Sequence, residues 1–168
     1  MMRGLAIFLL VTITLASAPA ARAADWGGLV PGETTQKAVT AAYGPPTRTT
    51  APKVDGYDTQ QWVYEGAQAP AGLRRLTVDF GLLARTGYRS DVIRAFTLEP
   101  NPGVFTMLTI FHGWGEPDRM GKQGEVPVFL YYDGLLVYFD PKGQLAETLI
   151  FTTPQPPGAE DKPRPAPR

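Results

Sequence analysis

Apolar and polar residues alternate most regularly between positions 75 and 80, where leucine, valine and phenylalanine are interleaved with arginine, threonine and aspartate. A period of two is typical of a β-strand that buries one face, so we predict a strand over 73–80. Segments enriched in β-branched and aromatic residues predict five further strands, over 57–65, 91–98, 126–132, 135–139 and 145–152. The pattern therefore predicts a chain built around antiparallel β-sheet.

Two shorter stretches place their apolar residues at helical spacing. In the first, alanine, valine and tyrosine between 38 and 43 mark one helical face, and Thr34 or Thr35 can cap the first amides. Gly44 suits the left-handed residue that ends such a helix. This helix is too short to persist alone in water, so we expect it to pack on the sheet. The second stretch, 104–113, is almost wholly apolar, which indicates a buried core helix.

The two helical stretches belong to an internal repeat with an offset of 71 positions, as Thr106 against Thr35 illustrates. The other matched pairs are Val39 with Ile110, Tyr43 with Trp114, Gly44 with Gly115, Pro46 with Pro117 and Arg48 with Arg119. A repeat of this kind constrains the architecture more strongly than any local pattern. We therefore predict an α+β fold of two tandem helix-βββ repeats, 24–100 and 101–153, whose short helices pack on one face of the antiparallel sheet.

The dipeptide Asp133-Gly134 separates two apolar runs and is a strong signal for a two-residue type I′ hairpin turn. Such a turn would pair Tyr132 with Leu135 and fix every later cross-strand pair. With Val137 and Phe139 facing the helix, the remaining side chains of this hairpin would fall on the opposite face.

That opposite face is predicted to carry an aromatic surface. The hairpin and the equivalent strand of the first repeat would contribute Trp62, Tyr64, Phe129, Tyr131, Leu136 and Tyr138. Exposed aromatic patches usually mark binding, so these six residues are the candidate partner surface. The alternative is that the other repeat, a loop or a second subunit covers them. Strand 145–152 does not decide, because both of its faces carry apolar residues.

The termini and the charge balance indicate an exported protein. Arg3, an apolar run over 5–16 and Ala21-Arg22-Ala23 match a cleavable signal peptide over 1–23, so we expect the mature chain to start near Ala24. Its charge would be −2, from 14 basic and 16 acidic residues, which argues against nucleic acid and anionic membrane partners. The chain has no cysteine and hence no thioether site for a lipid anchor. Residues 154–168 hold six prolines and predict a disordered tail.

Residues that usually carry catalysis are scarce. After the predicted signal peptide the chain has one serine, Ser90, and one histidine, His112, without a G-x-S-x-G motif, a phosphate loop or a metal-ligand cluster. His112 is expected near a helix C-terminus. A carboxylate pair drawn from Asp79, Asp91, Glu125 and Glu147 stays open, although nothing in the sequence selects one. We predict a protein without enzymatic activity, cofactor or metal.

The pattern Thr-x3-Val-x3-Tyr-Gly-x-Pro, followed by a tryptophan strand and a Leu-x-Val-x-Phe strand, resembles the outer-membrane assembly lipoprotein family (SmpA/OmlA, or BamE). The tandem arrangement is similar to the fold of beta-lactamase inhibitor protein, in which two helix-plus-sheet repeats bind a partner protein across a concave sheet face. The resemblance covers about 26–153 and lacks the lipidated cysteine of the first family and the disulfides of the second.

From the signal peptide and the absence of cysteine we predict a periplasmic or secreted protein, and from the aromatic face a module that binds an envelope protein. The resemblance implies a role in outer-membrane assembly or maintenance. The alternatives that remain open are an inhibitor of an envelope or secreted enzyme and a carboxylate-based hydrolase.

Overall fold

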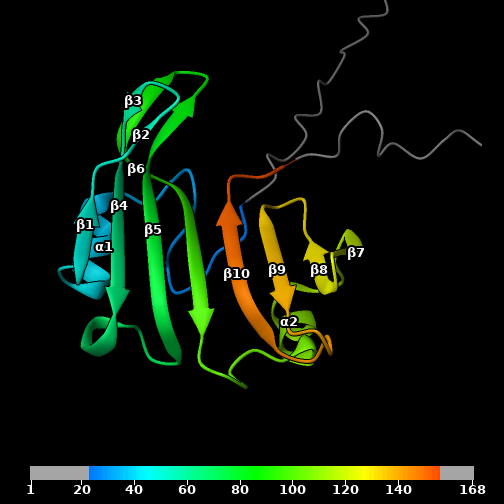
Figure 1. The fold of residues 1–168 in the computed structure, drawn as a ribbon. Coiled ribbons are helices and arrows are strands. Elements are labelled where there is room, and N and C mark those ends of the chain that lie inside the picture. The colour runs from blue at the N-terminus through cyan, green and yellow to red at the C-terminus, as the bar shows by residue number, and fades with distance from the viewer. Residues whose placement is uncertain (1–22, 156–168) are drawn as a thin grey trace, which may run out of the picture.

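The computed structural model describes residues 23–155. Its main feature is an eight-stranded antiparallel sheet in the order β1-β4-β5-β6-β10-β9-β8-β7, with a separate two-stranded β2-β3 hairpin (Figure 1). The strands are β1 (Arg48–Thr50), β2 (Lys53–Val54), β3 (Tyr57–Asp58), β4 (Gln60–Glu65), β5 (Leu73–Ala84), β6 (Gly87–Pro100), β7 (Arg119–Gln123), β8 (Val126–Leu130), β9 (Leu135–Phe139) and β10 (Ala146–Thr152). The helices are α1 (Gln36–Tyr43), α2 (Met107–Trp114) and a 3₁₀ turn, η1 (Gly66–Gln68).

The predicted fold class, an α+β fold of two helix-βββ repeats, is wrong. Strands make up 50% of the described residues and helices 14%, so this part of the chain is mostly β. Four strands of the large sheet, not three, follow each helix, because β1 and β7 form its two edges. Every residue of both edge strands is exposed. Short, exposed edge strands lack the apolar alternation of a half-buried strand, so the pattern could not reveal them.

The predicted helix caps are confirmed. The Thr35 hydroxyl accepts a hydrogen bond from the amide of Ala38, and Thr106 forms a capping box with Thr109. Gly44 and Gly115 end the helices with φ values of 74° and 80°, a conformation that glycine adopts without strain. The second helix begins three residues later than the start of the predicted 104–113 stretch, because Thr106 supplies the cap that Val104 cannot.

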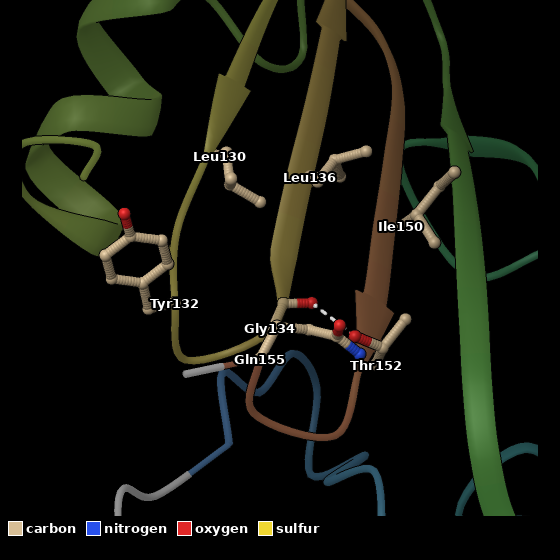
Figure 2. A pocket seen from close by; sticks show the side chains of 7 residues that line it. All are labelled: Leu130, Tyr132, Gly134, Leu136, Ile150, Thr152 and Gln155. Atoms are coloured by element: carbon tan, nitrogen blue, oxygen red, sulfur yellow. Dashed lines mark hydrogen bonds between the residues drawn. The ribbon is translucent and has the colours of Figure 1, made fainter. Parts of the chain in front are cut away.

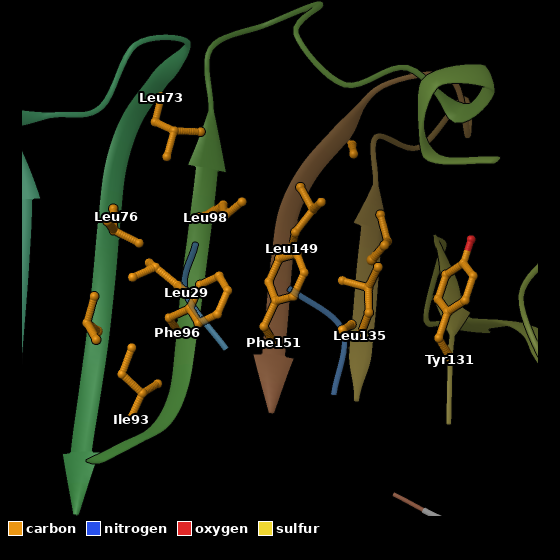
Figure 3. Packing of buried hydrophobic residues seen from close by; sticks show 14 of the residues in the cluster. Leu29, Leu73, Leu76, Ile93, Phe96, Leu98, Tyr131, Leu135, Leu149 and Phe151 are labelled. Atoms are coloured by element: carbon orange, nitrogen blue, oxygen red, sulfur yellow. The ribbon is translucent and has the colours of Figure 1, made fainter. Parts of the chain in front are cut away.

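The core lies between the sheet and a layer formed by both helices and the N-terminal segment. Val39 of α1, Ile110 of α2 and Leu29 of that segment are essentially inaccessible to solvent. Phe96 of β6 and Phe151 of β10 stack with ring centroids 4.4 Å apart, directly across the pair of strands that joins the two halves of the sheet (Figure 3). One continuous core therefore runs beneath both halves of the repeat.

Two equivalent hydrogen bonds relate those halves. The Tyr64 hydroxyl donates to the Gly44 carbonyl, and the Tyr131 hydroxyl donates to the Gly115 carbonyl, each over 3.1 Å. Each tyrosine thus ties its strand to the carbonyl that ends the neighbouring helix. An eight-residue helix is unstable in isolation, so this contact and the buried face hold it in place.

Candidate functional site

The turn between β8 and β9 decides which side chains can meet a partner. The pairs Phe129 with Val137 and Leu130 with Leu136 leave a three-residue loop, 132–134, and the Tyr131 amide donates to the Leu135 carbonyl at 2.9 Å. A two-residue type I′ turn requires positive φ at both of its central residues. Gly134 has a φ of 104°, but Asp133 does not have a positive φ. The predicted two-residue turn is therefore wrong. A shift of one residue turns every side chain of β8 to the opposite face.

Three of the six predicted contact residues consequently lie in the core. Tyr64, Phe129 and Tyr131 are only 0%, 4% and 3% exposed. The Phe129 ring meets the Phe139 ring edge to face, with centroids 4.7 Å apart. Burial raises the pKa of Tyr64 to about 12, with a further contribution from Tyr43. Burial likewise raises the pKa of Tyr131 to about 12, reinforced by nearby carboxylates.

Trp62 shares the core face as well, because its register partner is the fully buried Val78. It is half-buried, and its ring packs against that of Phe80 at a centroid distance of 4.7 Å. The assignment of Trp62 and Tyr64 to the uncovered face depended on the misplaced register of β8, and it fails with it. Leu136 and Tyr138 are the predicted contact residues that the structure places on the face away from the helices.

The uncovered face has its own continuous row of side chains. Strand pairing brings one residue from each of the eight strands into register, in the order Arg48, Val63, Thr77, Thr97, Ile150, Leu136, Leu130 and Arg119. The row is aliphatic from Ile150 through Leu136 to Leu130, whereas on β4 its apolar member, Val63, is only 3% exposed. The half of the face formed by β8, β9 and β10 therefore presents aliphatic side chains that no helix covers.

These aliphatic side chains line a cavity of about 330 Å³, which we call the β8–β10 groove. Figure 2 shows Leu130, Leu136 and Ile150 side by side on three neighbouring strands. The rest of the lining is formed by Tyr132, Gly134, Thr152 and Gln155. The Thr152 hydroxyl donates to the Gly134 carbonyl at 3.3 Å, and the backbone N–H of Gln155 donates to the Tyr132 carbonyl at 2.8 Å. The groove thus has an apolar floor and a polar rim.

A second cavity extends the groove toward the edge of the sheet. It is lined by Arg119, Met120, Gly121, Val128 and Leu130, and so shares Leu130 with the groove. Met120 is 64% exposed, but it pairs with the core residue Phe129 and so lies on the other face of the sheet. The β7 residues in register with the groove are Arg119 and Gly121, so the aliphatic surface of the groove ends at β8.

The other half of the uncovered face is charged and internally paired. The guanidinium of Arg75 donates to Glu65 at 2.9 Å and to Glu99 at 3.1 Å. Arg48 approaches Glu65 at 3.7 Å, and Arg74 approaches Glu99 at 3.2 Å. The hydrogen bond that Arg75 donates to Glu65, followed by the charge of Glu99, raises the pKa of Arg75. These charges largely neutralise one another, so this half offers a polar surface without a strong field of one sign.

Val128, Leu130 and Ile150 were not among the predicted contact residues. The available signal was that apolar residues occupy both faces of 128–130 and 149–151, where a sheet with one solvated face would alternate. The four carboxylates considered for hydrolysis lie on β5, on β6, between β7 and β8, and on β10. Asp79 accepts a hydrogen bond from Gln61 at 2.9 Å. Among residues 23–155 no cluster of three or more His, Cys, Asp or Glu residues could hold a metal ion.

Comparison with known proteins adds little. Neither the known family models nor the curated proteins gave a match. Among solved structures, the chain is similar to a DUF4309 family protein, YjgB, from Bacillus subtilis, with 16% sequence identity and a TM-score of 0.46. The similarity covers 75% of this chain and 82% of that one. A likeness at this level supports no argument about function. None of the helices within 23–155 has the length and hydropathy needed to cross a membrane.

Proposed function

We propose that this chain is an exported, non-enzymatic module that binds a partner protein of the cell envelope through the uncovered face of its sheet. The observation that carries the proposal is the β8–β10 groove, where three aliphatic side chains lie side by side beneath a polar rim. Apolar patches left uncovered on a folded protein usually mark an interaction site. An apolar centre with a polar periphery is also the usual composition of a protein interface.

The groove favours a protein partner over a small polar ligand. Its volume of about 330 Å³ lies at the small end of ligand pockets, and its floor carries no charged side chain. We therefore assign to it one or two apolar side chains of the partner, inserted as an anchor. Residues flanking that anchor would face Thr152 and Gln155 on one side and the paired charges of β4–β6 on the other.

A single substitution in the groove tests the proposal. We expect Leu136→Ser to weaken binding of a partner, captured from the native envelope and then purified, by about tenfold or more, since buried anchors of interfaces typically contribute on that scale. Leu83→Ser is the matched control, because Leu83 is 59% exposed at the far end of β5. Binding is measured by calorimetry with the purified pair, and the fold of each variant by circular dichroism.

The proposal is refuted if Leu136→Ser and Leu83→Ser bind every captured protein as the parent does. If the captured partner is an enzyme and its turnover falls on saturation, the module acts as an inhibitor. Unchanged turnover would indicate an assembly or scaffolding role.

A further inference from the structure

The carboxylate of Asp133, in the β8–β9 loop, forms no ion pair with any residue of 23–155. Asp133 Oδ1 is buried and accepts no hydrogen bond within the described residues. Burial raises the pKa of Asp133, a backbone hydrogen bond from Leu135 opposes that rise, and the charge of Asp118 adds to it. An unpaired buried carboxylate oxygen costs free energy, so its persistence calls for an explanation.

The start of the described chain lies against the backbone of Asp133. The backbone nitrogen of Ala24 donates to the Asp133 carbonyl at 2.9 Å. Both residues line an open cavity of about 560 Å³. Its complete lining is Ala23, Ala24, Asp25, Trp26, Gly27, Gly113, Trp114 and Asp133. No lysine, arginine or histidine is among these lining residues. The cavity therefore has acidic groups at its wall and lacks the positive charge that would balance them.

The chain that follows Ala24 is firmly anchored. Trp26 and Leu29 exchange two backbone hydrogen bonds, and Leu29 is 1% exposed in the core. The Tyr43 hydroxyl of α1 donates to the Gly27 carbonyl at 2.7 Å. The position of the Ala24 nitrogen is thus fixed by contacts on its C-terminal side. Removal of everything before it would leave that nitrogen in place.

We propose that Asp133 is a binding site for a primary ammonium group, and that its occupant is the α-amino group of Ala24 released by cleavage after Ala23. Hydrolysis of that peptide bond by a leader peptidase consumes one water, leaves the carboxylate on Ala23 and gives Ala24 an amine that takes up a proton. The ammonium has three donors where the amide had one. One N–H of the ammonium keeps its hydrogen bond to the Asp133 carbonyl oxygen, and a second is assigned to the Asp133 carboxylate. Maturation thereby completes an ion pair that the uncleaved chain lacks.

This inference rests on the predicted signal cleavage and not on the proposed partner binding. A chain that binds no partner would still form the ion pair, and a chain without the pair could still bind through the β8–β10 groove. The two proposals can therefore fail separately.

The test compares two defined amino termini. One chain begins at Ala24 and the other at Ala23, which carries the ammonium one residue further from Asp133. We expect the melting temperature of the chain beginning at Ala24 to be about 2–4 °C higher near pH 6.5. This is the shift that one ion pair produces in a chain of this size. Asp133→Asn keeps an acceptor for the Leu135 amide and removes the charge, so it should abolish the difference between the two chains.

The pH dependence follows from the same pair. A carboxylate partner raises the folded-state pKa of the ammonium above its unfolded value of about 7.7–8.0. The extra stability is thus fully present below that pH and is lost as pH rises through the folded-state pKa. The other ionisable groups near Asp133 and Tyr131 are Asp118, Glu116 and Asp25, and burial raises the pKa of Tyr131 to about 12.

Two results would overturn the inference. The first is an Asp133→Asn effect of equal size in both chains. The second is a first residue other than Ala24 in the exported protein, determined by mass spectrometry of its intact mass and N-terminal peptide.

Discussion

Two tyrosines that looked like partner contacts support the helices from beneath. Tyr64 and Tyr131 each donate a hydrogen bond to the carbonyl of the glycine that ends a helix, and each has its pKa raised to about 12. Both features have one cause, the burial of a phenol whose hydroxyl reaches a backbone acceptor. Their aromatic character contributes to stability, and exposure at an interface is not needed to explain it.

Replacing these phenols gives a prediction at the residue scale. The hydroxyl of the unfolded chain ionises near pH 10, whereas the native phenol stays protonated until about pH 12, so stability falls as pH rises across this interval. Tyr64→Phe and Tyr131→Phe should each cost about 0.5–1.5 kcal/mol at neutral pH, the usual net value of one hydrogen bond. The double variant should also show a shallower alkaline loss of stability.

Urea unfolding at pH 7 and at a series of values up to pH 11.5 measures both effects. Tyr138→Phe is the control, because Tyr138 lies on the uncovered face. Within residues 23–155 its hydroxyl forms no hydrogen bond of the kind seen for Tyr64 and Tyr131. Equal unfolding midpoints for Tyr131→Phe and Tyr138→Phe would contradict the structural role of Tyr131.

At the scale of elements, one dipeptide makes two different turns. Asp55-Gly56 joins β2 to β3 with both residues at positive φ, 50° and 84°, as a two-residue type I′ turn requires. Asp133-Gly134 belongs instead to a three-residue loop in which only the glycine is left-handed. Local chemistry permits both turns, so the choice must come from elsewhere.

The tertiary contacts of Tyr131 make that choice. Burial of its ring and the hydrogen bond to Gly115 hold Tyr131 on the core face, which sets the register of β8. The helix caps were predictable because Thr35, Gly44 and their repeat equivalents act within one turn of chain. The hairpin register and the edge strands could not be predicted, because they depend on residues distant in sequence. Most of the partner surface was therefore also not predictable.

Gly134 provides the prediction for the hairpin. A β-carbon at this position would lie 2.2 Å from the Thr152 carbonyl oxygen, a backbone atom that cannot rotate away. Gly134→Ala should therefore destabilise the fold by about 3 kcal/mol or more, combining left-handed strain with a steric clash. Gly87→Ala is the control, since its φ is 119° but nothing lies within 4 Å. Thermal unfolding should separate the two variants clearly, and equal losses would refute the close packing of this loop against β10.

At the scale of the whole molecule, the two halves share one core but differ in surface chemistry. The Phe96–Phe151 stack and the β6–β10 pairing make the sheet continuous beneath both. On the uncovered face, the first half carries mutually paired arginines and glutamates, and the second carries the aliphatic β8–β10 groove. The two halves thus share their helix caps and the tyrosine contacts to them, and the different chemistry of the uncovered face in the second half supports the proposed binding role.

Site-specific photo-crosslinking in the native envelope tests this binding role most directly. A benzoylphenylalanine at Tyr138, beside the groove on β9, is compared with one at Tyr57, which is 37% exposed on β3. We predict one discrete crosslinked partner from Tyr138, lost when Leu136→Ser is added, and no such product from Tyr57. Crosslinks of the same pattern and yield from both positions, or from Tyr138 regardless of Leu136, would contradict a partner-binding role for the groove.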